Sequence, residues 1–88
     1  MKNYYIVEIT DTFGGEANYC WVKRFAVKAK TIQGAMTALA KYQGDKGWRV
    51  AYGDNMSARY NLSGACACAF VDYIDLEDIG QEYKRINF

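Results

Sequence analysis

The chain has 88 residues, of which 51% are hydrophobic, and 11 basic residues nearly balance 10 acidic residues to give a net charge of +1. This length fits a single domain, residues 1–88, with a thin core. The sequence contains no histidine, the side chain most suited to acid–base catalysis near neutral pH, and its longest apolar run, residues 65–71, is too short to cross a bilayer. We therefore expect neither an enzyme nor a membrane protein.

The first third of the chain predicts two strands, residues 4–9 and 19–29, because apolar and polar residues alternate there. Between them lies a polar link, residues 11–18, which is longer than the two to five residues of an ordinary hairpin loop. Gly14 and Gly15 within it are free to adopt positive φ. In the first strand, one face carries Tyr5, Val7 and Ile9, and the other carries Tyr4, Ile6 and Glu8. In the second strand, the parity expected to face the core, at least in its second half, is interrupted by Lys23 and holds Tyr19, Trp21, Phe25, Val27 and Ala29; the other parity holds Cys20, Val22, Arg24, Ala26 and Lys28.

Residues 31–43 predict the clearest helix, because their apolar residues recur with helical spacing. Thr31 is suited to cap the helix N-terminus with its hydroxyl, and Gly44 is suited to end it. Gly34 weakens the helix interior, which indicates a close approach to the sheet.

The second half of the chain predicts further strands. Residues 47–52 form one, with Trp48, Val50 and Tyr52 inward and Arg49 outward. Residues 56–64 alternate over a short stretch and allow another strand.

Residues 65–73 predict a further strand, which is small or apolar at both parities up to Val71, as is typical of a central strand that is covered on both faces or pressed by a helix. After them, a short helix capped by Asp75 is expected, because Leu76, Ile79, Tyr83 and Ile86 repeat at helical intervals. The resulting order, β-β-α-β-β with a short C-terminal helix, predicts an α+β domain with a mostly antiparallel sheet and one packed helix.

The three cysteines, Cys20, Cys66 and Cys68, allow two interpretations. Structural zinc prefers four ligands with two to four residues between paired cysteines, whereas Cys66 and Cys68 are separated by one residue. Small thiols that fill tight strand positions explain the same pattern, so we expect no metal and no cofactor. The chain opens directly into an alternating segment, so we expect a reduced, cytoplasmic protein.

The polar link is the first candidate binding site. A Gly-hinged loop that presents polar and aromatic side chains on a rigid hairpin is suited to recognition of a partner. The alternative is a turn whose Asp and Asn side chains bond their own backbone. The candidate partner-binding residues are Asp11, Thr12, Phe13, Glu16 and Asn18.

Basic residues interleaved with aromatic ones give a second candidate, a sheet face that binds nucleic acid. Its candidate residues are Lys23, Arg24, Lys28, Arg49 and Arg59. The acidic C-terminal segment, which contains Asp72, Asp75, Glu77, Asp78 and Glu82, either mimics nucleic-acid phosphates toward a basic partner or is a solvated face.

The run Ile9-Thr-Asp-Thr-Phe-Gly-Gly-Glu-Ala-Asn-Tyr-Cys-Trp-Val-Lys-Arg24 resembles a segment of short, uncharacterised proteins of bacteriophages and prophages. Where those proteins tend to have serine, this chain has Cys20, which speaks against an essential thiol at that position. The resemblance implies an origin rather than an activity. Small accessory proteins of this kind often bind a host protein, for example to block a defence nuclease.

We therefore expect a non-enzymatic accessory protein of the bacterial cytoplasm that binds a host protein, with an anti-defence inhibitor such as an anti-CRISPR as one form of this function. Binding of nucleic acid is the alternative. The sequence also allows a homodimer, because the pairing of two copies of the chain would cover apolar surface that a small, aromatic-rich monomer exposes.

Overall fold

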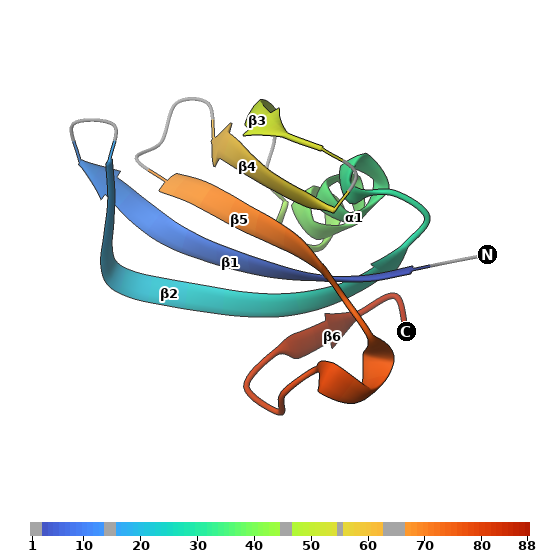
Figure 1. Cartoon of the computed structure of the whole chain (residues 1–88). Helices are drawn as coiled ribbons and strands as arrows, with labels where there is room; N and C mark the ends of the chain where they lie inside the picture. The colour runs from blue at the N-terminus through green and yellow to red at the C-terminus, as the bar shows by residue number, and fades with distance from the viewer. Residues whose placement is uncertain (1–2, 14–15, 45–46, 55, 63–66) are drawn as a thin grey trace.

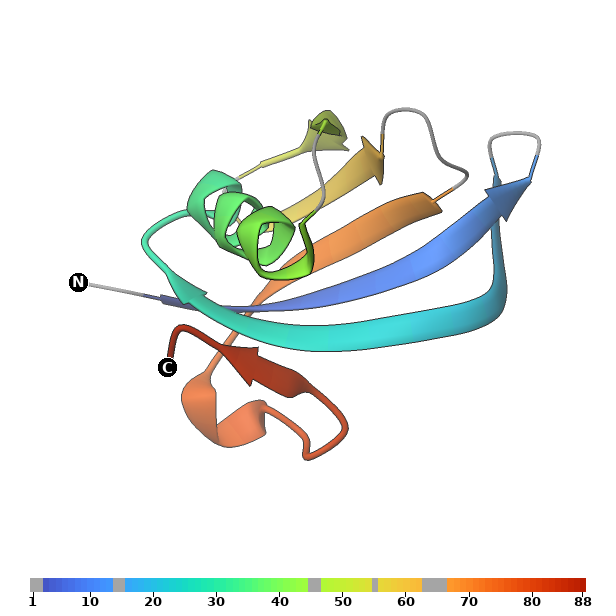
Figure 2. The same ribbon diagram turned by 180° about the vertical axis from the view of Figure 1, so that it is seen from behind.

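The computed structural model describes residues 3–13, 16–44, 47–54, 56–62 and 67–88, and for residues 13 and 16–21 it describes the backbone alone. Six strands form one sheet, and the α-helix of the described residues covers one of its faces (Figures 1 and 2). The order across the sheet is β3-β4-β5-β1-β2-β6, and only the pair of β2 and β6 is parallel. This confirms the α+β class. In chain order the elements are β1 (Asn3–Phe13), β2 (Glu16–Ala29), α1 (Ile32–Gln43), β3 (Trp48–Gly53), β4 (Ser57–Leu62), β5 (Ala67–Ile74), the 3-10 helix η1 (Leu76–Asp78) and β6 (Lys84–Ile86).

Helix α1 begins and ends as predicted. The Thr31 hydroxyl accepts a hydrogen bond from the Gly34 backbone N–H at 3.0 Å, and Gly44 adopts a φ of 76° after the last turn. A side chain at Gly34 would place its Cβ 3.2 Å from the capping oxygen and 3.7 Å from the Cβ of Ala29 on β2. The glycine therefore allows the helix start to lie against the end of a strand.

The main core lies between α1 and the sheet. Tyr5, Val7 and Ile9 of β1 share one face, as the alternation predicted, and the structure shows that all three are buried in this core. In the register, Val7 has Phe25 on one side and Val71 on the other, and both of these side chains are buried. The helix contributes four buried residues to the same cluster, namely Ile32, Ala35, Met36 and Leu39.

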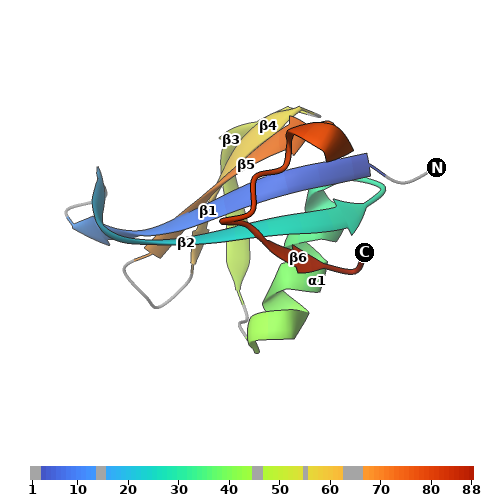
Figure 3. The ribbon, with the colours of Figure 1, turned by 90° about the horizontal axis from the view of Figure 1, so that it is seen from below.

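The opposite face of the sheet is partly covered by the segment between β5 and β6, which crosses β1 on its way to the far edge (Figure 3). Ala26 and Cys68 are fully buried on this face, and Ile79 of the crossing segment is buried as well. On β5, Cys68 is buried on this face, whereas Phe70 and Ile74 are half-buried and Asp72 is exposed, so the strand is covered on both sides only in part.

The C-terminal segment differs from the expected helix. A three-residue 3-10 helix, η1, is followed by a turn and by β6, and Asp75 makes no capping hydrogen bond with its side chain. Ile79 packs on the face opposite α1, whereas Ile86 packs in the core beneath α1 beside Val27. One helix cannot supply both contacts, because the chain has to cross the sheet between them.

The prediction that Val50 and Tyr52 face the core is wrong. Strand β3 is an edge strand, and these two side chains are 61% and 60% exposed. The register also shifts between them: Val50 lies opposite Tyr60, whereas Tyr52 lies opposite Arg59 on the other face. Residues 57–62, whose alternation allowed a short strand, form β4.

Candidate functional site

The five candidate partner-binding residues lie at one end of the β1–β2 hairpin. Both strands continue into the expected link, so that β1 reaches Phe13 and β2 begins at Glu16, and the prediction of a long loop is wrong. Main-chain hydrogen bonds do not depend on side-chain polarity, which is why threonine and aspartate can continue the ladder here. The side chains of Phe13, Glu16 and Asn18 and the whole of Gly14 and Gly15 lie outside the described residues.

The hairpin end is displaced from the helix-covered core. α1 lies near the start of β1, and the hairpin projects to the opposite end of the molecule (Figures 1 and 3). Asp11 pairs with Ala67 at the beginning of β5, so beyond that point β1 has β2 as its sole paired strand among the described residues. The backbone of the hairpin end therefore extends past the described part of β5.

A register shift between Thr10 and Thr12 changes the direction of the strands at this point. Thr10 pairs with Val22 and Thr12 with Ala17, which leaves additional residues on β2 between the two pairs. Such bulges increase the local twist and redirect side chains, and they are frequent next to functional sites. Of the candidate residues, Asp11 and Thr12 are half-buried, and Asp11 accepts a long hydrogen bond of 3.5 Å from the Thr10 hydroxyl.

Four of the five basic candidates share the sheet face opposite α1. Directly opposite residues of an antiparallel pair point to the same face, and the register places Arg24 opposite Glu8, Lys28 opposite Tyr4 and Arg59 opposite Phe70. Arg49, opposite Asn61, belongs to this face too. Lys23 lies opposite Ile9 and therefore belongs to the other face.

This face is mixed in charge. Arg24 Nε forms an ion pair with Glu8 Oε2 at 3.1 Å, and both side chains are largely exposed, so the pair adds little stability. The ammonium of Lys28 lies 5.8 Å from the ring centre of Tyr4, and the guanidinium of Arg59 lies 5.5 Å from that of Phe70. Cations beside aromatic rings are the arrangement that stacks nucleic-acid bases, which supports the second candidate site.

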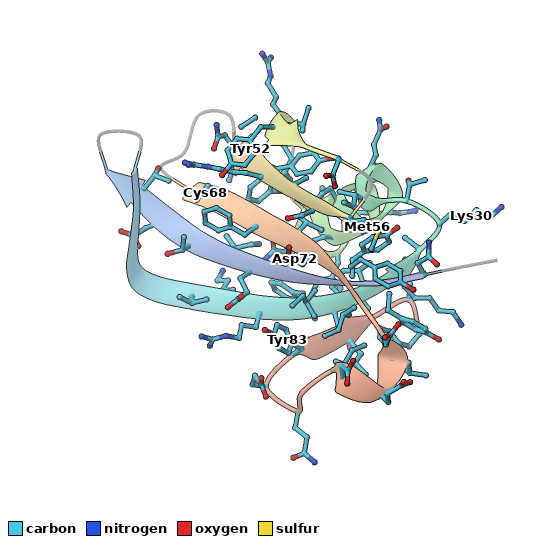
Figure 4. The ribbon with its side chains drawn as sticks, in the orientation of Figure 1. Lys30, Tyr52, Met56, Cys68, Asp72 and Tyr83 are labelled. Atoms are coloured by element: carbon cyan, nitrogen blue, oxygen red, sulfur yellow. The ribbon has the colours of Figure 1, made fainter. Side chains whose placement is uncertain are left out.

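The crossing segment brings Tyr83 to the same face, near Asp72 of β5 (Figure 4). Burial raises the pKa of Tyr83, and the nearby carboxylates of Glu8 and Glu82 raise it further. Asp72 Oδ1 accepts a hydrogen bond of 2.8 Å from the Ser57 hydroxyl. Tyr83 is thus a neutral hydrogen-bonding group at neutral pH. Its position was not predicted, because the crossing segment was expected to be helical.

Cys68 is the cysteine whose side chain the structure describes, and it lies fully buried on β5 (Figure 4). Burial is the main cause that raises the pKa of its thiol, and Asp11 adds to the rise, whereas Arg59 opposes it. A thiol held in its neutral form is a poor nucleophile and a poor metal ligand. Cys20 and Cys66 belong to the side chains that are not described, so the predicted absence of a metal site stays a prediction for them.

The structure reveals a groove between α1 and β3 that the sequence did not indicate. It consists of two hollows of about 660 and about 580 Å³, which share Gln33, Val50 and Tyr60. Tyr60 is 9% exposed, burial raises the pKa of its hydroxyl, and none of the described residues hydrogen-bonds to it. The groove went unrecognised because it depends on the edge position of β3, which places Val50 at its rim rather than in the core.

Within the described residues, no three or more Cys, Asp and Glu side chains form a group that can hold a metal ion. The helices of that same part of the chain are also too short and too polar to cross a membrane. No protein-family model, curated protein or solved structure matches this chain.

Proposed function

We propose that this protein is a non-enzymatic binding protein, an accessory protein of a bacteriophage or prophage that binds a host protein in the bacterial cytoplasm through its hairpin end. The observation that supports the site is the projection of the β1–β2 hairpin away from the core that α1 covers (Figure 1). Segments that project from a rigid sheet are well placed to contact a partner without disturbing the core. The viral origin and the anti-defence form of the function rest on the resemblance of residues 9–24 alone.

Capture of host proteins from a nuclease-treated bacterial lysate tests this proposal. The tagged protein is compared with the double variant Phe13→Ala/Glu16→Ala and with a control, Glu77→Ala/Gln81→Ala, which changes two exposed residues of the crossing segment. We expect one dominant host protein to be retained by the wild type and the control and lost from the hairpin variant. Equal retention by all three proteins would contradict the assignment of the site.

Nucleic-acid binding is the second candidate function, and the common face of Arg24, Lys28, Arg49 and Arg59 favours it. Fluorescence anisotropy with labelled single-stranded DNA and RNA at increasing salt measures it directly, since phosphate contacts make affinity fall steeply with salt. The matched variants are Lys28→Ala/Arg49→Ala, on this face, and Lys23→Ala, on the other. Weakening by the first variant alone would support this function, and absent or salt-independent binding would exclude it.

A further inference from the structure

Strand β3 forms an edge of the sheet, and on its outer side no described strand pairs with it. An edge strand presents a row of backbone N–H and C=O groups, and an extended chain laid beside it satisfies them. Five of the six residues of β3 are exposed, from Arg49 to Gly53. The backbone of β3 is therefore available as a template for an added strand.

The groove beside β3 can receive the side chains of such a strand. α1 makes its contacts chiefly with β2 and reaches β6, at the far edge of the sheet, and β3 is exposed from Arg49 to Gly53. One hollow extends from Val50 toward Gly53 and Met56, and the other extends from Val50 toward Trp48 and Gly47. The second hollow thus follows β3, along which alternate side chains of an added strand repeat about every 7 Å, whereas the first also crosses the sheet to Tyr73 of β5 and Tyr5 of β1.

The hollow that reaches Trp48 and Gly47 is lined mainly by apolar groups, whereas the other hollow also has the polar side chains of Asn3, Thr31 and Asp54 in its lining. Val50 and Met56 are 61% and 56% exposed at the rim, and Met36 and Tyr60 lie buried at the base. Lys30 lines the same hollow, but its ammonium points away from the body of the molecule (Figure 4). An incoming apolar side chain would bury the exposed parts of Val50 and Met56, and the burial of this apolar surface would favour binding.

The other side chains of an added strand would lie on the face opposite α1, where the charge of β3 decides their chemistry. Arg49 is the one charged residue of β3, and the register places it on this face. A carboxylate across from it would form a favourable cross-strand pair. A second copy of β3 brings no carboxylate to this position, because the strand contains no acidic residue.

We propose that β3 and the groove form a second binding site, separate from the hairpin end, that takes an extended segment of a partner protein as a seventh strand. The segment alternates apolar side chains, which enter the groove, with acidic side chains, which lie beside Arg49. Its partner class is thus an acidic, extended peptide rather than a folded surface.

The probe is a capped eight-residue peptide in which valine alternates with glutamate, compared with a peptide in which lysine replaces glutamate. Binding is followed by the shifts of backbone amide signals of the ¹⁵N-labelled protein. We expect the glutamate peptide to shift the signals of β3 and the lysine peptide to bind at least tenfold more weakly. In Arg49→Glu this preference should reverse, whereas Lys23→Glu, a charge change at a position away from the groove, should keep the wild-type preference.

Three outcomes would overturn the proposal. Neither peptide shifts the β3 signals, or both variants keep the same preference, or the free protein is a dimer that Val50→Asp dissociates. The last result would show that a second copy of the chain covers this edge. Reversal in Arg49→Glu is independent of any loss of folding, because it requires that the variant gain affinity for the lysine peptide.

Discussion

Val50 and Tyr60 lie directly opposite each other across the β3–β4 pair, yet Val50 is 61% exposed and Tyr60 is 9% exposed. The difference arises because Val50 is on the edge strand, whereas Tyr60 is on the next strand inward and is covered by α1. The pair therefore marks the boundary between the core and the groove.

Replacement of Tyr60 by phenylalanine should leave the stability nearly unchanged. Tyr60 is 9% exposed and its hydroxyl has no hydrogen-bond partner among the described residues, so its removal forfeits no bond there. We expect the free energy of unfolding in urea to stay within about 0.5 kcal/mol of the wild type or to rise. A loss of more than about 1 kcal/mol would show that the hydroxyl has a partner in the folded protein.

Alkaline pH should destabilise the protein partly through Tyr60. Burial raises the pKa of this hydroxyl in the folded state, so its proton is held more tightly there than in the unfolded chain. The stabilising contribution is complete below the unfolded pKa, near 10, and is lost as the pH rises through the folded pKa. Urea unfolding between about pH 8 and about pH 11 should therefore show a smaller decline for Tyr60→Phe than for the wild type. Identical declines would contradict the burial of this hydroxyl.

The helix cap of α1 should be worth about 1 kcal/mol. Thr31→Ala removes the oxygen that accepts from Gly34, and Thr31→Ser keeps it. Thr37 provides the control, because its hydroxyl donates to the Gln33 carbonyl within the helix, and its loss in Thr37→Ala should be neutral or slightly stabilising. Thermal unfolding followed by circular dichroism would distinguish the two sites, and an equal loss for both alanine variants would argue against the cap.

The segment that crosses the sheet should contribute to stability through Ile79. This side chain is 8% exposed on the face opposite α1, so Ile79→Ala should lower the free energy of unfolding by about 2 kcal/mol or more. Leu76, three residues earlier, is 43% exposed, and Leu76→Ala is expected to cost far less. If both substitutions have the same small effect in urea unfolding, the segment does not pack on the sheet.

What the sequence predicts well is determined locally. The ends of α1 follow from Thr31 and Gly44, which act within one turn of the chain, and the common face of Tyr5, Val7 and Ile9 follows from strict alternation. The orientation of Tyr52 depends instead on a register shift against β4, and alternation along β3 cannot reveal it. The positions of Ile79 and Ile86 depend on the path of the chain across the sheet. The two residues happen to be spaced as in a helix, so their spacing did not reveal this path.

The candidate sites likewise have features that a local sequence pattern predicts and features that depend on the tertiary structure. The parity of the second strand correctly grouped Arg24 with Lys28 and separated both from Lys23. That Arg59 lies on the same face, on a strand separated from β2 by β1 and β5, depends on strand order, which the sequence does not encode in any local pattern. The groove depends on both the strand order and the position of α1. No local sequence pattern predicts either of them, so only the structure shows the groove.

The central claim is that a host protein binds at the hairpin end, and site-specific photo-crosslinking in bacterial cells tests it most directly. A photoreactive phenylalanine analogue is placed at Phe13 on the hairpin or, as a control, at Tyr42, which is 50% exposed on α1. We expect a single crosslinked host protein from position 13 and none from position 42. A crosslink from position 42 alone, or none from position 13, would contradict the claim.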